Sequence, residues 1–166
     1  MKKYVVLDTN VIISSLYAKR SKNLLSSPFL VLNKVFNRKN GIVPLYNKEI
    51  LNEYKNVLSR KKFNFSAPRI GKFINDFKKI AVNIDDLPEI KEDISFPDVK
   101  DIVFYQITLS KESSYLVTGN IIHFPVKPFV VTPKEYLEIL NGKKIEEIRK
   151  GPEMDKGLEM DKGPER

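Results

Sequence analysis

Four polar positions of this chain carry groups that could do chemistry together: Asp8, Glu53, Asp101 and Asn120. Clustered carboxylates repel one another and need a cation, and an all-oxygen set of ligands favours Mg²⁺ or Mn²⁺ over zinc. Such an ion orients a phosphodiester, lowers the pKa of a bound water and neutralises charge in the transition state. If the fold brings these four side chains to one place, they predict metal-dependent phosphodiester chemistry.

Each position also has a structural interpretation. Asp8 directly follows a short apolar run, where a carboxylate is a metal ligand, a phospho-acceptor or a helix cap. Glu53 has Glu49 one turn earlier on nearly the same side of a predicted helix, so either could project toward the site. An isolated glutamate on a helix is usually solvated, and only its place among the other residues favours a role for it.

Two further segments supply the remaining candidates. Asp98 and Asp101 are three residues apart at a predicted helix entrance, where one carboxylate can cap free backbone N–H groups and the other can complement the helix dipole. Asn120 follows Thr118 and Gly119 in a predicted turn, and an Asn beside a Gly is usually there for its backbone conformation. Metal binding and local backbone roles therefore both stay open for these residues.

The hydrophobic periodicity predicts the elements that must position these groups. Short apolar runs alternate with helical patterns almost throughout. We expect strands over 4–7, 42–45, 80–84, 115–118 and 129–131, and helices from 26 or 27 to about 41, from 47, over 68–79, over 97–109 and from the capping box at 132–135. This alternation predicts an α/β fold of three layers, α/β/α, with a central parallel five-stranded sheet. Ligands of such sheets bind beyond the carboxyl ends of the strands, which is where Asp8 and Asn120 are expected.

The composition limits the class of protein. The 166 residues allow about one domain. No cysteine is present, which excludes disulfides, thiolate metal sites and cysteine nucleophiles. No apolar run approaches the roughly 18 residues of a membrane span, so no membrane partner is expected. The apolar run that follows Lys2 and Lys3 is too short for a signal peptide, and we expect a cytoplasmic protein.

Charge and repeats separate a body from a tail. The net charge of +8 belongs to residues 1–140, and the segment 19–79 holds fifteen basic and three acidic residues, a balance that suits a phosphate backbone or simply a solvated surface. From 141 to 166 the charges cancel, and KGPEMD, KGLEMD and KGPER repeat with a period of six. We therefore predict a folded domain over 1–140 and a disordered charged repeat tail over 141–166.

Four segments together resemble the PIN-domain nucleases, in particular the VapC-like toxins of prokaryotic toxin–antitoxin pairs. They are VVLDTNVIISSL at 5–16, YNKEILNEYKNVLSRKKF at 46–63, FPDVKDIVFYQ at 96–106 and YLVTGNIIHFPVKPFVVTPKEYLEIL at 115–140. The resemblance implies that the catalytic set is Asp8, Glu53, Asp101 and Asn120, with the first three as metal ligands. Where many PIN nucleases have a fourth Asp, this chain has Asn120, which adds no charge. The residues implied as neighbours of the ligands are Asn10, Asp98 and Thr118.

The resemblance also implies an activity and partners. It implies Mg²⁺- or Mn²⁺-dependent endonucleolytic cleavage of RNA, toxicity through that cleavage, a cognate antitoxin protein and a homodimer. Basic residues of the segment 19–79 would then hold the RNA strand, and Tyr17 and Tyr46 could stack on its bases.

Two other hypotheses stay open at this point. The first is a non-catalytic nucleic-acid-binding module that has kept the fold and lost the chemistry, which the amide at Asn120 favours. The second is a phospho-receiver-like signalling domain with Asp8 as acceptor. That domain would need an acidic pair ahead of its first strand's end, where this chain has Lys2 and Lys3.

Overall fold

The computed structural model describes residues 1–151 and contains the five-stranded parallel sheet that the periodicity predicts. The strand order is β3-β2-β1-β4-β5, and every neighbouring pair is parallel. The strands are β1 (Lys3–Leu7), β2 (Ile42–Tyr46), β3 (Val82–Asn83), β4 (Tyr115–Val117) and β5 (Val130–Val131). The chain moves outward from β1 to β3 and then returns to β4 on the other side of β1, so the order reverses next to the central strand. The carboxyl ends of β1 and β4 at this reversal form the expected ligand-binding edge.

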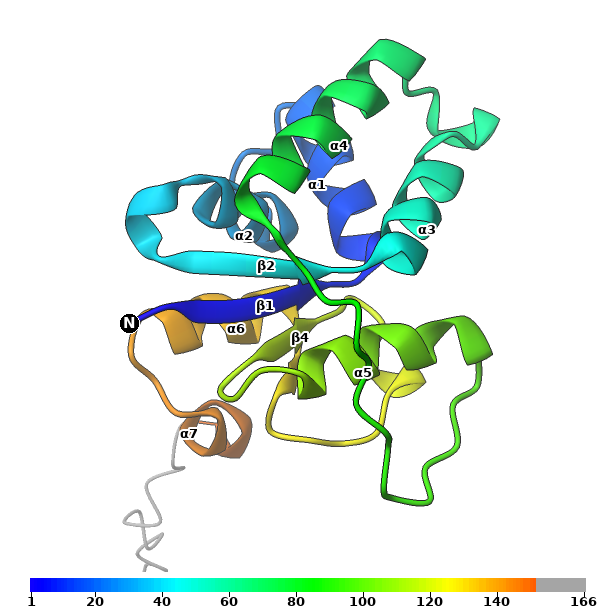
Figure 1. The fold of residues 1–166 in the computed structure, drawn as a ribbon. Coiled ribbons are helices and arrows are strands. Elements are labelled where there is room, and N and C mark those ends of the chain that lie inside the picture. Colours follow the sequence, from blue (N-terminus) through cyan, green and yellow to red (C-terminus); the bar gives the residue numbers. More distant parts are fainter. Residues whose placement is uncertain (152–166) are drawn as a thin grey trace, which may run out of the picture.

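Helices cover both faces of the sheet, which makes the fold a three-layer α/β/α arrangement. Figure 1 shows α1–α4 on one side of the strands and α5 on the other, where α5 packs on β1, β2 and β4. The helices are α1 (Thr9–Arg20), α2 (Ser27–Phe36), α3 (Lys48–Leu58), α4 (Ala67–Ile80), α5 (Ile102–Leu109), α6 (Pro133–Leu140) and α7 (Ile145–Lys150). Within residues 1–151, no helix is long and apolar enough to cross a membrane.

The core forms where the central strand meets the apolar faces of the helices. The β1 residues Val5, Val6 and Leu7 are fully buried, as expected for a strand with helices on both faces. The α3 helix begins where the sequence predicts, because the Asn47 side chain accepts a hydrogen bond from the backbone N–H of Ile50 at 2.9 Å. The predicted capping box of α6 is also present.

Helix α1 was not predicted from the sequence. It follows β1 without a loop and contacts both α2 and α3. Its buried residues therefore include small and polar side chains as well as apolar ones, among them Ser15 and Ala18. The Ser15 hydroxyl lies 2.8 Å from the carbonyl oxygen of Val11 and 2.6 Å from that of Pro28. Burial on several sides removes the single apolar stripe on which a prediction from periodicity depends.

The predicted helix over 97–109 has two parts. A 3₁₀ turn spans Val99–Asp101, and α5 begins only at Ile102. Asp98 caps the turn, since its side chain accepts a hydrogen bond from the backbone N–H of Lys100 at 2.9 Å. Asp101 thus lies at the junction between the turn and the α-helix. The strand predicted over 80–84 is also shorter than expected, because only Val82 and Asn83 pair with β2.

The folded part of the chain extends past the predicted boundary at residue 140. Helix α7 packs against α6, and its first residue, Ile145, is buried in the core. Arg149 fixes the helix, with Nη2 donating to the Val130 carbonyl oxygen at 2.7 Å and Nε donating to Glu135 at 3.1 Å. The prediction of a disordered tail over 141–166 is therefore wrong for α7, where Ile145, Ile148 and the anchored Arg149 attach a short helix to the rest of the fold. Residues 152–166 of that predicted tail lie outside the described residues.

Candidate active site

Asp8 lies at the carboxyl end of β1 and is held there by three donors. Its side chain is buried, and Oδ1 accepts a hydrogen bond from the backbone N–H of Thr9 at 2.7 Å. Oδ2 accepts from Asn10 Nδ2 at 2.9 Å and from Thr118 Oγ1 at 2.8 Å. Asp8 is thus the cap of α1, and the same bonds fix the orientation of its carboxylate. Two of the predicted neighbours, Asn10 and Thr118, contact it directly.

The turn after β4 is fastened to the start of α1. Thr118 is fully buried, and its hydroxyl accepts a hydrogen bond from the backbone N–H of Asn120 at 2.9 Å. The backbone N–H of Gly119 donates to Asn10 Oδ1 at 2.9 Å. A Cβ atom at Gly119 would lie 3.2 Å from that oxygen, so glycine lets the turn approach α1 this closely. Asn120 itself is exposed, and its side chain makes no hydrogen bond within the described part of the chain.

Glu53 reaches the same edge from α3. Its Oε1 accepts a hydrogen bond at 3.4 Å from Oγ1 of Thr9, the residue that follows Asp8 in the chain. The neighbouring Tyr54 is buried and donates its hydroxyl hydrogen to the carbonyl oxygen of Leu7, which fixes α3 to the end of β1. Glu49 is exposed one turn earlier. The structure therefore brings Glu53, rather than Glu49, to the end of the central strand.

Asp101 lies directly before the first residue of α5, close enough to Asp8 and Glu53 for their charges to act on it. Its side chain is 15% exposed, and Oδ2 is buried with no hydrogen-bond partner among residues 1–151. His123 Nδ1 lies 3.5 Å from that oxygen. The His123 contact was not predicted, because it depends on how the turn after β4 folds back over α5.

Burial and like charge act together on these carboxylates. Burial, followed by the charges of Asp8 and Asp98, raises the pKa of Asp101 from 3.8 to about 6, and His123 only partly opposes this. Burial also raises the pKa of Asp8, and the charge of Glu53 adds to that effect. The three hydrogen bonds that Asp8 accepts lower its pKa and so oppose the other two effects. Asp98 is exposed and acts on Asp101 through its charge. The edge is thus a region where negative charge accumulates at an energetic cost.

The donor set at this edge fits a divalent cation by its chemistry. Asp8, Glu53 and Asp101 supply only oxygen ligands, and the buried oxygen of Asp101 has no donor in the described chain. A cation beside that oxygen would relieve both the repulsion and the unpartnered group. Within residues 1–151, the side chains as placed do not form a group of three or more His, Asp or Glu around one ion position.

The two tyrosines expected to stack on bases pack against the chain itself. The ring centroid of Tyr17 lies 5.8 Å from that of Phe63 and 5.5 Å from that of Phe65, and the Arg20 guanidinium lies 4.4 Å from the Tyr17 ring centroid. Tyr46 packs edge-on against Phe77 at 6.1 Å. The Tyr17 contacts hold the segment between α3 and α4 onto α1, and the Tyr46 contact joins β2 to α4.

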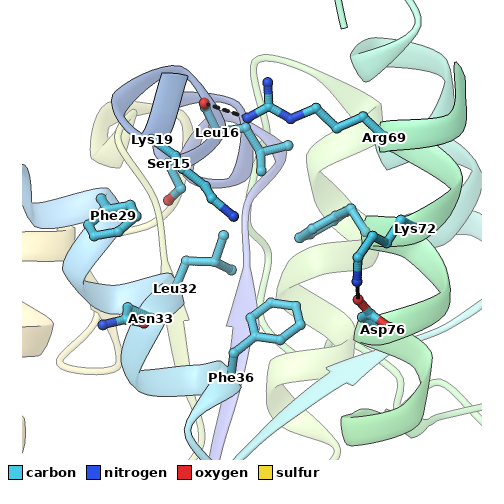
Figure 2. Close-up of a pocket in the computed structure, with 11 residues that line it drawn as sticks. Ser15, Leu16, Lys19, Phe29, Leu32, Asn33, Phe36, Arg69, Lys72 and Asp76 are labelled. Atoms are coloured by element: carbon cyan, nitrogen blue, oxygen red, sulfur yellow. Dashed lines mark hydrogen bonds and ion pairs between the residues drawn. The ribbon is translucent and has the colours of Figure 1, made fainter. Parts of the chain in front are cut away.

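A separate pocket lies between α1, α2 and α4 (Figure 2). Its volume is about 430 Å³, and apolar side chains such as Leu16, Leu32 and Phe36 form much of its wall. At its rim Lys72 pairs with Asp76 at 2.6 Å. Asp8, Glu53 and Asp101 do not line this pocket. The candidate chemistry therefore lies at the sheet edge and not in this cavity.

Comparison with known protein families gave one match. A family model described as "PIN domain" matches residues 4–122, which is well over half of the chain. The matched range begins in β1 and ends just after Asn120, so it contains all four positions predicted to do the chemistry. Comparison with curated proteins gave no match.

Proposed function

The chain belongs to the PIN-domain family, and on that premise we propose that it is a Mg²⁺- or Mn²⁺-dependent ribonuclease that hydrolyses phosphodiester bonds within RNA. The observation that supports this most directly is the electrostatic coupling of carboxylates from three elements. Asp8 after β1, Glu53 on α3 and Asp101 before α5 are close enough that Asp8 and Glu53 both raise the pKa of Asp101. A nuclease whose metal is held by carboxylates needs this arrangement.

The roles of the residues follow from their contacts. Asp8, Glu53 and Asp101 would hold the ion, with Asn120 at the fourth position as an uncharged ligand. When bound, the ion supplies a water of lowered pKa and neutralises charge that develops on the scissile phosphate. Thr118 and Asn10 keep the Asp8 carboxylate in one orientation through hydrogen bonds of 2.8 and 2.9 Å. Positioning of this kind reduces the reorganisation that the reaction requires.

The charge of the chain supports a polyanionic substrate. The net charge is +8, and fifteen basic residues lie between Lys19 and Lys79, a segment that includes α3 and its acidic Glu53. An excess of lysine and arginine attracts a phosphate backbone over long range, and the attraction weakens as salt is added. RNA binding is therefore expected to fall steeply with ionic strength.

We further propose that this ribonuclease is the toxin of a toxin–antitoxin pair and that it forms a homodimer. The four segments that resemble VapC-like toxins support this, because they include every predicted site residue. The antitoxin protein would insert a segment near the carboxylate edge. Expression of the chain alone should stop growth of the host, and the Asp8→Asn variant should not.

The test of the catalytic proposal is cleavage of a mixed RNA pool by the purified protein with Mn²⁺, with EDTA, and as Asp8→Asn. Asn caps a helix about as well as Asp, so the variant should stay folded. We expect metal-dependent cleavage that the variant lacks, and Asp76→Asn on α4 is a matched control that should cleave normally. Cleavage by Asp8→Asn in EDTA would refute the proposal. RNA binding that EDTA does not affect, without any cleavage, would instead favour a non-catalytic binding module. The absence of cleavage would then be attributed to Asn120.

A further inference from the structure

A second depression lies beside the carboxylates, between α3 and α5. Its volume is about 250 Å³, and it shares Glu53 with the candidate active site. Val103 and Phe104 of α5, both buried, form its apolar wall. Pockets for drug-sized ligands usually span roughly 300–1,000 Å³, so this depression suits a smaller flat group such as one nucleobase.

The wall formed by α3 carries hydrogen-bonding groups. Glu49, Asn52 and Asn56 line the depression, and all three are exposed. They share one side of the helix with Glu53, because residues three and four apart lie next to one another on an α-helix. A carboxamide offers both a donor and an acceptor, whereas an ionised carboxylate only accepts. These three side chains can therefore read the edge of a base.

Lys100 places a cation at the opposite rim. It lines the depression, its side chain is exposed, and its backbone N–H is held by Asp98 at 2.9 Å. Asp101 follows it directly in the chain. A nucleotide with its base against α3 would thus have its phosphate between Lys100 and the carboxylates that are proposed to act on it.

Resting on the ribonuclease function proposed above, we propose that this depression binds the base of an unpaired nucleotide next to the scissile phosphate and discriminates against uracil. Adenine, cytosine and guanine carry an exocyclic amino group that can donate to the Glu49 carboxylate. Uracil has carbonyl oxygens on both sides of its one N–H, and these oxygens repel a carboxylate. Reading of unpaired bases by their edges is the usual way in which proteins recognise RNA sequence.

The first measurement is the base composition at the cut sites. Wild-type protein with Mn²⁺ cleaves a pool of single-stranded RNA, and the ends of the products are sequenced. We expect uridine to be depleted roughly fivefold or more at one position beside the cut, as a single side-chain-to-base pair typically provides. Glu49→Gln should lose most of this depletion, since the amide can donate to a uracil carbonyl. Asn52→Ala and Asn56→Ala should slow cleavage and weaken the base preference.

The matched control is Glu112→Gln, which removes the same charge from an exposed residue between α5 and β4. It should keep both the cleavage rate and the uridine depletion. Random base composition at wild-type cut sites, or a depletion that Glu49→Gln leaves unchanged, would overturn the inference while the ribonuclease function stands.

A measurement of RNA binding tests this inference independently of the proposed ribonuclease function. Fluorescence anisotropy in EDTA measures the affinity of the full chain for labelled oligo(C), oligo(A) and oligo(U) of equal length. We expect oligo(U) to bind several-fold more weakly than the other two, and the difference to disappear in Glu49→Gln. Equal affinities in the wild type would overturn the inference. If no RNA is cut under any condition, the ribonuclease proposal fails, and the affinities still decide whether the depression reads a base.

Discussion

Replacing Asp101 with asparagine should stabilise the protein at neutral pH while it abolishes cleavage. The Asp101 side chain is 15% exposed, and its Oδ2 has no hydrogen-bond partner within residues 1–151. Its pKa is raised from 3.8 to about 6, mainly by burial and then by the charge of Asp8. The folded protein therefore holds the proton of this carboxyl more tightly than the unfolded chain does. Above pH 6, folding requires a buried charge that the structure opposes.

The magnitude follows from the difference of about two pKa units between the folded and unfolded states. One unit corresponds to 1.36 kcal/mol, so the ionised Asp101 lowers the free energy of unfolding by about 3 kcal/mol at most. The sign follows from proton linkage, since the folded state binds more protons than the unfolded state between pH 3.8 and about 6. The stabilising effect of the protonated carboxyl is complete below pH 3.8 and is lost as pH rises through 6. The Asp101→Asn variant lacks this contribution to the pH dependence of stability.

Thermal unfolding in EDTA at low salt measures this difference. At pH 7.5 we expect Asp101→Asn to melt roughly 5–10 °C above the wild type, given about 2–4 °C per kcal/mol for a domain of this size. At pH 4 the two melting temperatures should converge. Asp76→Asn is the control, because hydrogen bonds donated by Lys72 and Lys79 lower the pKa of the half-buried Asp76. That variant should show no gain at pH 7.5.

Two results would refute the reasoning. A wild type as stable as Asp101→Asn at pH 7.5, in the absence of metal, would show that the charge of Asp101 is not destabilising. A gain of the same size at pH 4 and at pH 7.5 would show that the variant acts through packing and not through charge. Mn²⁺ extends the test, because a ligand that binds only the folded state raises the melting temperature. The ion should stabilise the wild type more than Asp101→Asn.

Three further predictions concern the groups around the site. Thr118→Val should lower the free energy of unfolding in urea by about 1.5–3 kcal/mol, because it removes a hydrogen bond to the buried Asp8 carboxylate; an unchanged urea midpoint would contradict this. Gly119→Ala places a Cβ atom 3.2 Å from Asn10 Oδ1 and should slow cleavage roughly tenfold without changing the circular dichroism spectrum; wild-type rates would show that this contact does not orient Asp8. Arg149→Ala should lower the free energy of unfolding by about 1 kcal/mol, since it releases α7, and a melting temperature equal to that of the wild type would mean that the core holds α7 without it.

Much of the fold follows from local rules. The strands that form the sheet were predicted because they are short apolar runs that end in polar turns. The start of α3 followed from Asn47 and the start of α6 from the capping box at Thr132, where the caps satisfy free backbone N–H groups. Helix α1 and helix α7 were missed for opposite reasons. Helix α1 is buried on several sides and has no single stripe, and α7 is too short to show one.

The site was predictable only in part. The carboxyl edge of a parallel sheet placed Asp8 and Thr118 close together, and the structure shows a hydrogen bond of 2.8 Å between them. No rule of spacing could predict that Thr9 contacts Glu53 or that Tyr54 bonds to the end of β1, because these contacts depend on the tilt of α3. The sequence offered only one hint, which is that Thr9 and Tyr54 are the chain neighbours of Asp8 and Glu53, the residues selected for their chemistry.

Asp8 and Asp101 differ in how far the protein itself satisfies their carboxylates, and this difference indicates different roles in binding a ligand. Three donors satisfy Asp8, so its position is fixed before any ligand arrives. Asp101 has a buried oxygen without a donor in the described chain and a pKa near 6, although a hydrogen bond from a nearby side chain would have stabilised the fold. Unsatisfied charge of this kind persists where function requires it. A cation is the ligand that would satisfy Asp101 without disturbing Asp8. The increase in the free energy of unfolding in Asp101→Asn therefore measures the stability that the protein loses by keeping an unpartnered carboxylate at this position.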